Sequence, residues 1–547
     1  MQLSQENEQT LEWWQKAVVY QIYPRSFKDS NNDGIGDLPG ITGKLDYLAW
    51  LGVDAIWLSP FYPSPMNDGG YDIADYQNVH PNIGTLQDFE RMVDRAHQLG
   101  LKVIVDFVPN HTSDQHAWFK ESRSSRDNPK RDWYFWQDGK PGSQPPNNWI
   151  SSFGGSAWEW DEQSGQYYLH SFLTSQPDLN WRNPDVKNAM FDVLRFWMDR
   201  GVDGFRIDVA HQIMKDPLLR DNPPNPNPMA PPGMPLRDFN MQLHVNDQEH
   251  PDVHVIYREL RALLNSYSHG QPRAAIGEIH VSSPAEWATY YGANLDEIHL
   301  PFNFGLLRAE WRSSSVRTVV DTLEKTLPPG AWPNYVMGNH DEPRIVSRIG
   351  EPSARLAMLL LLTLRGTPTL YYGDELAMHD VTIPPERIQD GWEKQSGGLG
   401  VSRDPQRTPM QWDSSPNGGF TAEGVQPWLP LADDYDQLNV KAETDQSASM
   451  LTLTHRLLQL RRVTPALVGG SYEALNNVPP DCYAFLRRSA GQTLLVALNF
   501  SGKEETVKLD QPGQGNVLLS TRLDREGPVD LSAITLRAHE ACIIVLS

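Results

Sequence analysis

The sequence has little cysteine and comparatively little positive charge. Its 547 residues include two cysteines, Cys482 and Cys542, which exclude a disulfide framework and form neither a CxxC nor a Cys/His metal pattern, so we expect two buried thiols. Lys and Arg number 47 against 69 Asp and Glu, a formal net charge of −22. That balance excludes a protein built to hold phosphate backbones, and we expect no nucleic-acid partner.

Long hydrophobic runs are also missing. The most apolar stretch, LAMLLLLTL at 356–364, is far shorter than the ~18 residues of a membrane span. The first residues, MQLSQENEQTLEWW, lack the basic and apolar regions of a secretory signal. We therefore expect a cytoplasmic protein with no membrane partner, and its 10% aromatic residues indicate a folded chain.

Short β-rich runs alternate with amphipathic stretches through the first 465 residues, the clearest helices being expected at 185–202, 315–327 and 352–366. Eight such units predict an α/β fold, a (β/α)₈ TIM barrel whose active-site groups cluster at the C-terminal strand ends. The eight expected strand regions are 18–27, 54–61, 102–111, 203–210, 274–279, 297–304, 333–341 and 367–376.

Two insertions and a tail interrupt this rhythm. We expect the barrel to comprise 1–106 and 180–465, with an irregular insertion at about 377–435. Residues 107–179, rich in Gly, Pro, Ser and aromatics, are long enough for a subdomain inserted after strand 3. From 466 to 547 apolar and polar residues alternate, which predicts a C-terminal antiparallel β domain.

Polar residues follow four of the expected strands. On a barrel these strand ends meet, so a carboxylate-rich site with Arg and His partners is expected. The sequence shows neither a dinucleotide fingerprint nor a Cys/His metal cluster, and we expect no organic cofactor. Glycosidic bond cleavage uses such a set, because one carboxylate attacks the anomeric carbon while a second protonates the leaving oxygen. The strand-end residues are Asp106, Asn110, His111, Arg206, Asp208, Glu278, Asn339, His340 and Asp341.

The stretches DFVPNH (106–111), GFRID (204–208), GE (277–278) and NHD (339–341) resemble the four signature regions of the α-amylase superfamily, glycoside hydrolase family thirteen. Three more, GVDAIWLSP (52–60), QPDLN (176–180) and RTPMQWD (407–413), resemble its α-glucosidase and oligo-1,6-glucosidase branch. The resemblance implies a barrel, a B domain on the third loop, a β-sandwich C domain, and an exo-acting, retaining α-glucosidase that takes short oligosaccharides.

The resemblance implies that Asp208 is the nucleophile, Glu278 the general acid/base and Asp341 the carboxylate that stabilises the distorted sugar. Arg206, on the same strand face as Asp208, is expected to hold that carboxylate ionised. Glu278 is expected to need a raised pKa, so that it is protonated when substrate arrives.

The family also implies a pocket closed at one end around the terminal glucose. Its expected binding residues are the hydrogen-bonding pair His111 and His340, a clamp of Asp68, Tyr71 and Arg407, and two B-domain residues, Phe172 and Gln176. Phe153 fits either this lining or the B-domain core.

The run DSNNDGIGD has EF-hand-like spacing, with a turn glycine at position 6 but Gly40 where the bidentate Glu would stand. Many family members carry a structural Ca²⁺ or Mg²⁺ on this loop, and we expect one here; the alternative is a self-capped Asx-rich turn. The expected ligands are Asp29, Asn31, Asp33, Asp37 and the carbonyl of Ile35.

Several alternatives stay open. Val209, after the nucleophile, resembles enzymes that cut α-1,6 bonds, but the neighbouring residues resemble a different bacterial α-glucosidase group. Water or a sugar can attack the glycosyl-enzyme, so a trehalose or isomaltulose synthase type of isomerase or transglucosidase is the main alternative to hydrolysis. A catalytically silent binding subunit is the third reading. Both a monomer and a homodimer fit the sequence.

Overall fold

The computed structural model describes residues 11–230, 235–268, 271–281, 283–509 and 513–546. Most of the N-terminal stretch considered above lies outside these ranges. Within them, no helix combines the length and the apolar character needed to cross a membrane.

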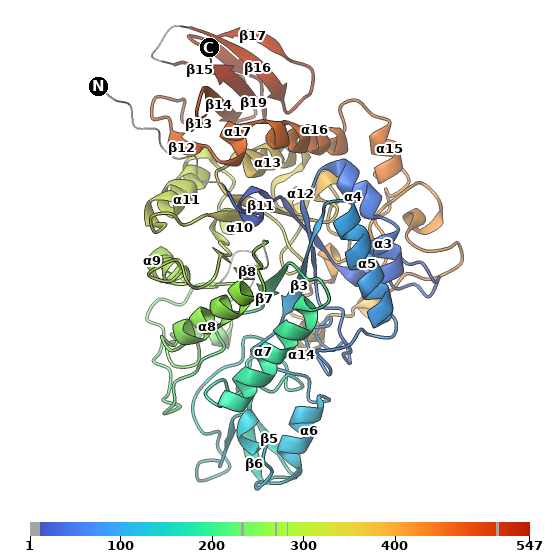
Figure 1. The fold of residues 1–547 in the computed structure, drawn as a ribbon, viewed down its shortest axis with the longest axis vertical. Helices are drawn as coiled ribbons and strands as arrows, with labels where there is room; N and C mark the ends of the chain where they lie inside the picture. The colour runs from blue at the N-terminus through green and yellow to red at the C-terminus, as the bar shows by residue number, and fades with distance from the viewer. Residues whose placement is uncertain (1–10, 231–234, 269–270, 282, 510–512, 547) are drawn as a thin grey trace.

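The eight expected strands form one parallel sheet wrapped into a barrel (Figure 1), in the order β10-β11-β1-β2-β3-β7-β8-β9. Residues of β1, β2, β7 and β8 are buried throughout, as in strands covered on both faces. Among the described residues, β9 and β10 do not pair as strands. Between them, the main-chain N–H of Asn303 donates a hydrogen bond to Asn334 Oδ1 at 3.2 Å. The strands are β1 (Val19–Ile22), β2 (Ala55–Leu58), β3 (Lys102–Phe107), β7 (Gly204–Ile207), β8 (Ala274–Gly277), β9 (Leu300–Pro301), β10 (Asn334–Val336) and β11 (Thr367–Tyr371).

The helices begin where the sequence provides caps. Thr85 and Asp88 form a capping box at the start of α5, and the Asn183 side chain caps α7, which has Pro184 at its first position. The predicted helices at 185–202, 315–327 and 352–366 are confirmed as α7, α11 and α13. The helices are α1 (Trp13–Lys16), α2 (Pro24–Phe27), α3 (Leu38–Thr42), α4 (Leu45–Leu51), α5 (Leu86–Gln98), α6 (Ala117–Ser124), α7 (Pro184–Met198), α8 (Val253–Ser266), α9 (Pro284–Thr289), α10 (Gly305–Arg308), α11 (Ser313–Thr326), α12 (Ile345–Ile349), α13 (Glu351–Thr363), α14 (Gly391–Ser396), α15 (Val440–Thr444), α16 (Met450–Val463) and α17 (Pro465–Val468).

A small subdomain follows β3, at the opposite end of the molecule from the C-terminal domain (Figure 1). It contains α6 and an antiparallel sheet in the order β4-β6-β5, formed by Trp136–Gln137, Gln166–Leu169 and Trp158–Asp161. Phe119 of α6 stacks on Trp136 with ring centroids 5.6 Å apart. This aromatic pair joins the large core shared with the barrel, whereas a separate small core of the insertion is formed by Trp149, Ala157, Trp158, Tyr167 and Leu169.

The C-terminal domain is an antiparallel sandwich. One face of its large sheet, including Ala484 and Ala497, packs with Val507 and Ile534 of the small sheet β15/β18. The other face carries Phe485 and the residues that point away from the small sheet, and it packs into the barrel core beside α13. The strands are β12 (Ser471–Ala474), β13 (Cys482–Ser489), β14 (Gln492–Asn499), β15 (Glu505–Val507), β16 (Gln514–Ser520), β17 (Gly527–Asp530), β18 (Ile534–Leu536) and β19 (Ala541–Leu546).

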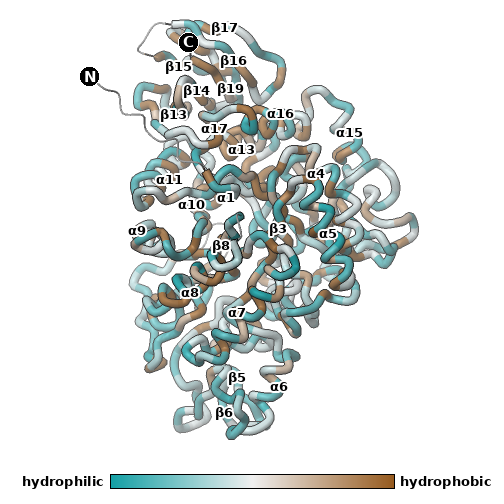
Figure 2. The backbone as a smooth tube through the Cα atoms, in the orientation of Figure 1, coloured by the Kyte–Doolittle hydropathy of each residue, from teal (hydrophilic) through white to brown (hydrophobic). Residues whose placement is uncertain are grey.

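The apolar run at 356–364 lies in α13 and its C-cap residue, between barrel and C-terminal sheet, and its residues are all buried. Figure 2 shows the apolar stretches gathered where α13 meets this sheet. Contact with protein on both sides therefore explains its uniform hydrophobicity. Cys482 and Cys542 are free and buried, as predicted.

Candidate active site

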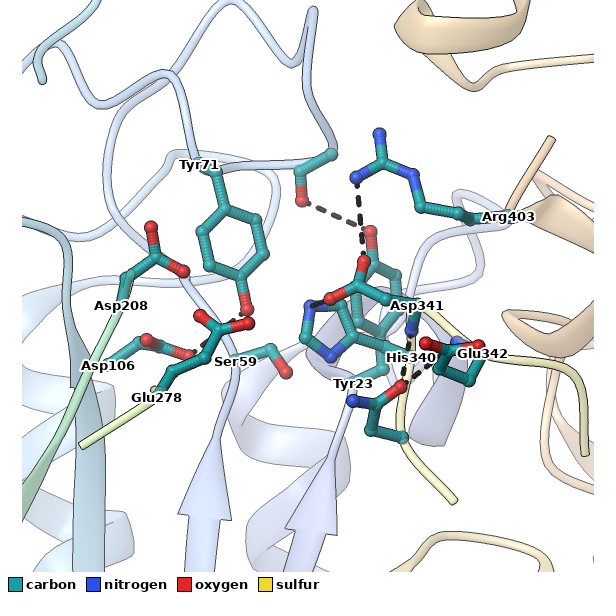
Figure 3. A network of polar contacts seen from close by, with 12 residues as sticks. Tyr23, Ser59, Tyr71, Asp106, Asp208, Glu278, His340, Asp341, Glu342 and Arg403 are labelled. Atoms are coloured by element: carbon teal, nitrogen blue, oxygen red, sulfur yellow. Dashed lines mark hydrogen bonds and ion pairs between the residues drawn. The ribbon is translucent and has the colours of Figure 1, made fainter. Parts of the chain in front are cut away.

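The strand ends bring the expected catalytic side chains together. Asp106 lies in β3 and is in register with Arg206 of β7, while Asp208 and Glu278 directly follow β7 and β8. Asp341 follows β10. Because all these strands are parallel, their carboxyl ends meet at one rim, and Figure 3 shows the side chains converging there.

Arg206 is the hub of this cluster. Its Nη1 donates to Asp208 Oδ1 at 2.6 Å and to Asp106 Oδ1 at 2.8 Å, and its Nη2 donates to Glu278 Oε2 at 2.6 Å. The guanidinium is buried, with 2% of the side chain exposed, and a delocalised charge with a fork of donors suits three partners at once. Tyr71 donates to the remaining oxygen of Asp106 at 3.2 Å.

Three carboxylates around one guanidinium cannot all ionise freely. Burial, with Glu278 and Asp106 nearby, raises the pKa of Asp208 well above its usual range, and burial raises the pKa of Asp106 to about 6. Burial also acts to raise the pKa of Glu278, but Arg206 and His280 outweigh it and hold that pKa well below its usual range. In the free site these directions are the reverse of those expected from the sequence, because Arg206 is shared and His280 donates to Glu278.

Burial favours the neutral form of both predicted sugar-binding histidines. Burial lowers the pKa of His340 to about 3 and lowers that of His111. Gln21 donates to His340 Nδ1 at 2.8 Å, which leaves the proton on Nε2, 3.2 Å from Asp341 Oδ2. Tyr71 stacks on the His340 ring at 5.3 Å. A neutral imidazole held this way presents its Nε2–H beside the predicted third carboxylate.

Asp68 lies beside a buried arginine, Arg403, that the sequence did not point to. Asp68 forms its ion pair with Arg403, whose Nη2 lies 2.7 Å from Asp68 Oδ1 and 2.6 Å from Asp390 Oδ1. Arg407, the expected clamp residue, donates to Asp341 Oδ1 at 2.9 Å and to the His340 carbonyl at 2.8 Å. The two arginines stand four positions apart in one irregular insertion and both contact Asp341, since Arg403 Nη1 lies 3.4 Å from Asp341 Oδ1. Only the folded structure shows that Arg403 is the one that holds Asp68.

The other predicted lining residues lie around the same space. The Gln176 side-chain amide is placed to donate to Asp68 at 2.9 Å and to His111 at 3.1 Å, and the Phe172 ring lies 5.1 Å from His111. Phe153 stacks on Trp392 of α14 at 4.9 Å, so it connects the B domain to the insertion.

Two further polar residues, Lys215 and His280, contact groups at the rim, although no sequence motif predicts these contacts. The buried Lys215 lies 3.0 Å from Asp178 and 3.1 Å from Asn110. It therefore connects the loop after β7 with the stretch that bears Gln176. His280 donates to Glu278 at 2.7 Å.

Val209, directly after Asp208, has φ of +35° and is buried. A β-branched residue in this region is a backbone outlier that costs of order 1–3 kcal/mol. The conformation aims the Val209 N–H at Glu278 Oε2, 2.9 Å away. The strained backbone thus connects the residue after Asp208, the expected nucleophile, to Glu278, the expected acid/base.

The 29–37 loop is an Asx-rich turn. Asp29 accepts from the main-chain N–H groups of Asn31, Asn32 and Gly34, and Thr421 donates to its second oxygen at 2.6 Å. Gly34 has φ of +87°, and a Cβ there would meet the Gln426 carbonyl at 2.3 Å.

Oxygen ligands are those that Ca²⁺ and Mg²⁺ prefer, but each Asp29 oxygen already accepts two hydrogen bonds, and only the Asp33 oxygens, which accept one each, retain a free lone pair for a cation. In the described ranges no three His, Cys, Asp or Glu side chains are grouped to hold a metal ion. A cation would therefore also use Asn31 Oδ1 and the Ile35 carbonyl, and the metal stays a prediction.

Comparison with known proteins shows which family the chain resembles. Residues 21–470 match the family described as alpha amylase, catalytic domain. A probable α-glucosidase of Rhizobium meliloti is 41% identical to this chain, and the match covers 94% of this chain and 95% of that protein. An oligo-1,6-glucosidase of Parageobacillus thermoglucosidasius is 38% identical, and the match covers 97% of this chain and 98% of that protein. Among solved structures, an α-glucosyl transfer enzyme superposes with a TM-score of 0.92 at 41% identity, over 98% of this chain and 100% of that one. A trehalulose synthase from Pseudomonas mesoacidophila gives 0.89 at 36%, with the same coverage.

The chain is thus a barrel glycosidase, and it belongs to the α-amylase family, glycoside hydrolase family thirteen. Within that family it falls in the branch of the α-glucosidases and oligo-1,6-glucosidases, and it is a glycoside hydrolase.

Proposed function

We propose that the protein is an exo-acting, retaining α-glucosidase that removes terminal non-reducing glucose from short maltose- or isomaltose-type sugars. The carrying observation is the cluster in which one guanidinium, Arg206, holds both Asp208 and Glu278. Two carboxyl groups within reach of one guanidinium suit the roughly 5–5.5 Å separation of retaining enzymes. In this mechanism Asp208 attacks the anomeric carbon and Glu278 protonates the leaving oxygen, then takes a proton from the attacking water.

Exo action is supported by the ion pair between Asp68 and Arg403, which would close one end of a pocket around a terminal sugar. Asp68 and Arg403 are both buried, and with His111 and His340 they offer charged and neutral partners to the hydroxyls of one terminal sugar. A chain continuing beyond that sugar would have to displace a buried ion pair, which is costly.

A transglucosidase or isomerase is the second candidate. The solved structures it resembles include an α-glucosyl transfer enzyme and a trehalulose synthase. The same glycosyl-enzyme serves both outcomes, because the acceptor is either water or a sugar hydroxyl. We also propose that a structural cation stabilises the 29–37 loop.

A time course of products from maltose, isomaltose, sucrose and trehalose tests the proposal. The expected result is early release of α-glucose from maltose or isomaltose, detected by chromatography and proton NMR. New disaccharides with little free glucose would move the protein to the isomerase class. Early β-glucose would refute the retaining mechanism.

A further inference from the structure

His280 lies beside Glu278 but has no role in the chemistry described so far. It comes two residues after Glu278 on the irregular segment that follows β8, and its ring stacks on Phe304 at 4.2 Å. Its Nε2 lies 2.7 Å from Glu278 Oε1, and its side chain is 29% exposed.

The tautomer of His280 follows from its second contact. Arg308 Nη2 lies 3.1 Å from Nδ1, and a guanidinium only donates, so Nδ1 is the acceptor. The proton of the neutral ring is then on Nε2 and is donated to Glu278. Glu342, beside Asp341, lies 3.6 Å from Arg308, so this chain of contacts joins the ends of β8 and β10.

The two oxygens of Glu278 therefore have different surroundings. Oε2 accepts from Arg206 and from the Val209 N–H at 2.9 Å, which occupies both of its lone pairs. Oε1 accepts from His280 and retains one free position. The proton delivered to a glycosidic oxygen must therefore leave from Oε1, since Oε2 has no position for it.

We propose that His280 is a positioning residue for the acid/base: it directs Glu278 Oε1 toward the glycosidic oxygen and keeps the carboxylate ionised until substrate arrives. This inference rests on the proposed function. An Oε1 that carries a proton still has a lone pair for Nε2–H, so the contact orients the group as acid and as base.

The other charged and titratable groups that face Glu278 remain when His280 is replaced. They come from β3, β7 and the ends of β7 and β10, and they are Asp106, Arg206, Asp208, His211, His340 and Asp341. Around His280 itself stand Glu278, His211 and Arg308, with Glu342 behind the arginine. Loss of the imidazole therefore removes one donor from Oε1 and leaves the rest of the cluster in place.

The test compares His280→Leu, which cannot donate, with His280→Gln, whose amide can. Activity requires protonated Glu278, so a higher pKa for this group moves the alkaline limb of kcat/KM upward. We expect His280→Leu to move the alkaline limb upward by about one pH unit, which corresponds to the free energy of one charge-assisted hydrogen bond. In His280→Gln the limb should return to its wild-type position. Sugars with poor leaving groups should lose more rate than α-glucosyl fluoride, which needs little acid assistance.

An infrared titration of the carboxyl band measures the pKa of Glu278 without turnover. The Glu278→Gln variant, which lacks this carboxyl group, identifies its band. The titration separates the two proposals: a wild type that cleaves no α-glucoside refutes the proposed function, while a shift of the Glu278 band in His280→Leu still supports the positioning role. His455→Leu, on α16 against Trp50, is the control histidine. If His280→Leu does not fold, His280→Asn replaces it, since its shorter amide cannot reach Oε1.

Two results would overturn the inference. One is an alkaline limb and carboxyl band in His280→Leu that match wild type. The other is equal loss of rate in the Leu and Gln variants with no shift of either limb, which would assign His280 to packing alone.

Discussion

Replacing Arg403 with Met tests whether this arginine closes the pocket. The guanidinium Nη2 bonds both Asp68 and Asp390, and its Nε donates to Asp390 at 2.9 Å. Side-chain exposure is 9% for Arg403, 6% for Asp68 and 0% for Asp390. Arg403→Met keeps the apolar stem and leaves two buried carboxylates without their shared cation.

The structure sets the size of two effects. Removing one partner of a buried ion pair costs about 3–5 kcal/mol. With an unfolding entropy of about 2.1 cal/mol/K per residue over 547 residues, that corresponds to a melting temperature about 3–4 °C lower. An Asp68 carboxylate that is no longer held loses a charged hydrogen bond to the sugar, about 1.5–3 kcal/mol, or about 10- to 150-fold in kcat/KM.

The assay combines thermal unfolding with kcat/KM on whichever disaccharide the wild type cleaves faster. Arg407→Met is the informative comparison, because that side chain bonds Asp341 and should lower kcat more than it raises KM. Arg456→Met, which breaks an exposed pair with Glu526, is the control and should change stability by less than about 0.5 kcal/mol. The reasoning fails if Arg403→Met keeps kcat/KM within twofold while Arg407→Met raises KM, since the clamp would then be Arg407.

Three further predictions concern the nucleophile, pH and the metal. Asp208→Asn should lower kcat by at least about 10⁴-fold with the fold intact, because an amide cannot attack the anomeric carbon; substantial residual turnover on purified protein would remove the assignment. Burial raises the pKa of Asp374 to about 7, so its ionised form destabilises the fold. Its contribution to stability should be present below about pH 4 and lost as pH rises to about 7, a dependence that Asp374→Asn should reduce in denaturant titrations. Chelator should lower the melting temperature more than the initial rate if a cation binds at 29–37; loss of turnover with no thermal shift would contradict a structural role.

Periodicity made much of the fold predictable. The eight strands lie within their expected regions because strands covered on both faces are short, apolar and followed by polar residues. The C-terminal sandwich was likewise visible in its alternation, since the two faces of the sheet pack against different partners.

The site was predictable where chemistry follows a strand directly. Arg206, Asp208 and Glu278 are close in sequence to β7 and β8, so parallel pairing alone brings them to one rim. Arg403 and His280 were missed because an irregular insertion and a coil segment carry no periodicity that says where a side chain points.

The sequence by itself determined the barrel, the family and which carboxylates meet at the rim, because these depend on local pattern and on order along the chain. Only the tertiary structure decided how charge is shared among them. Arg206 serves three carboxylates, Arg403 holds Asp68, and His280 donates to Glu278. These pairings arise between segments far apart in the chain or from one rotamer at a strand end, and electrostatic energy depends on distance and burial, which residue order does not specify.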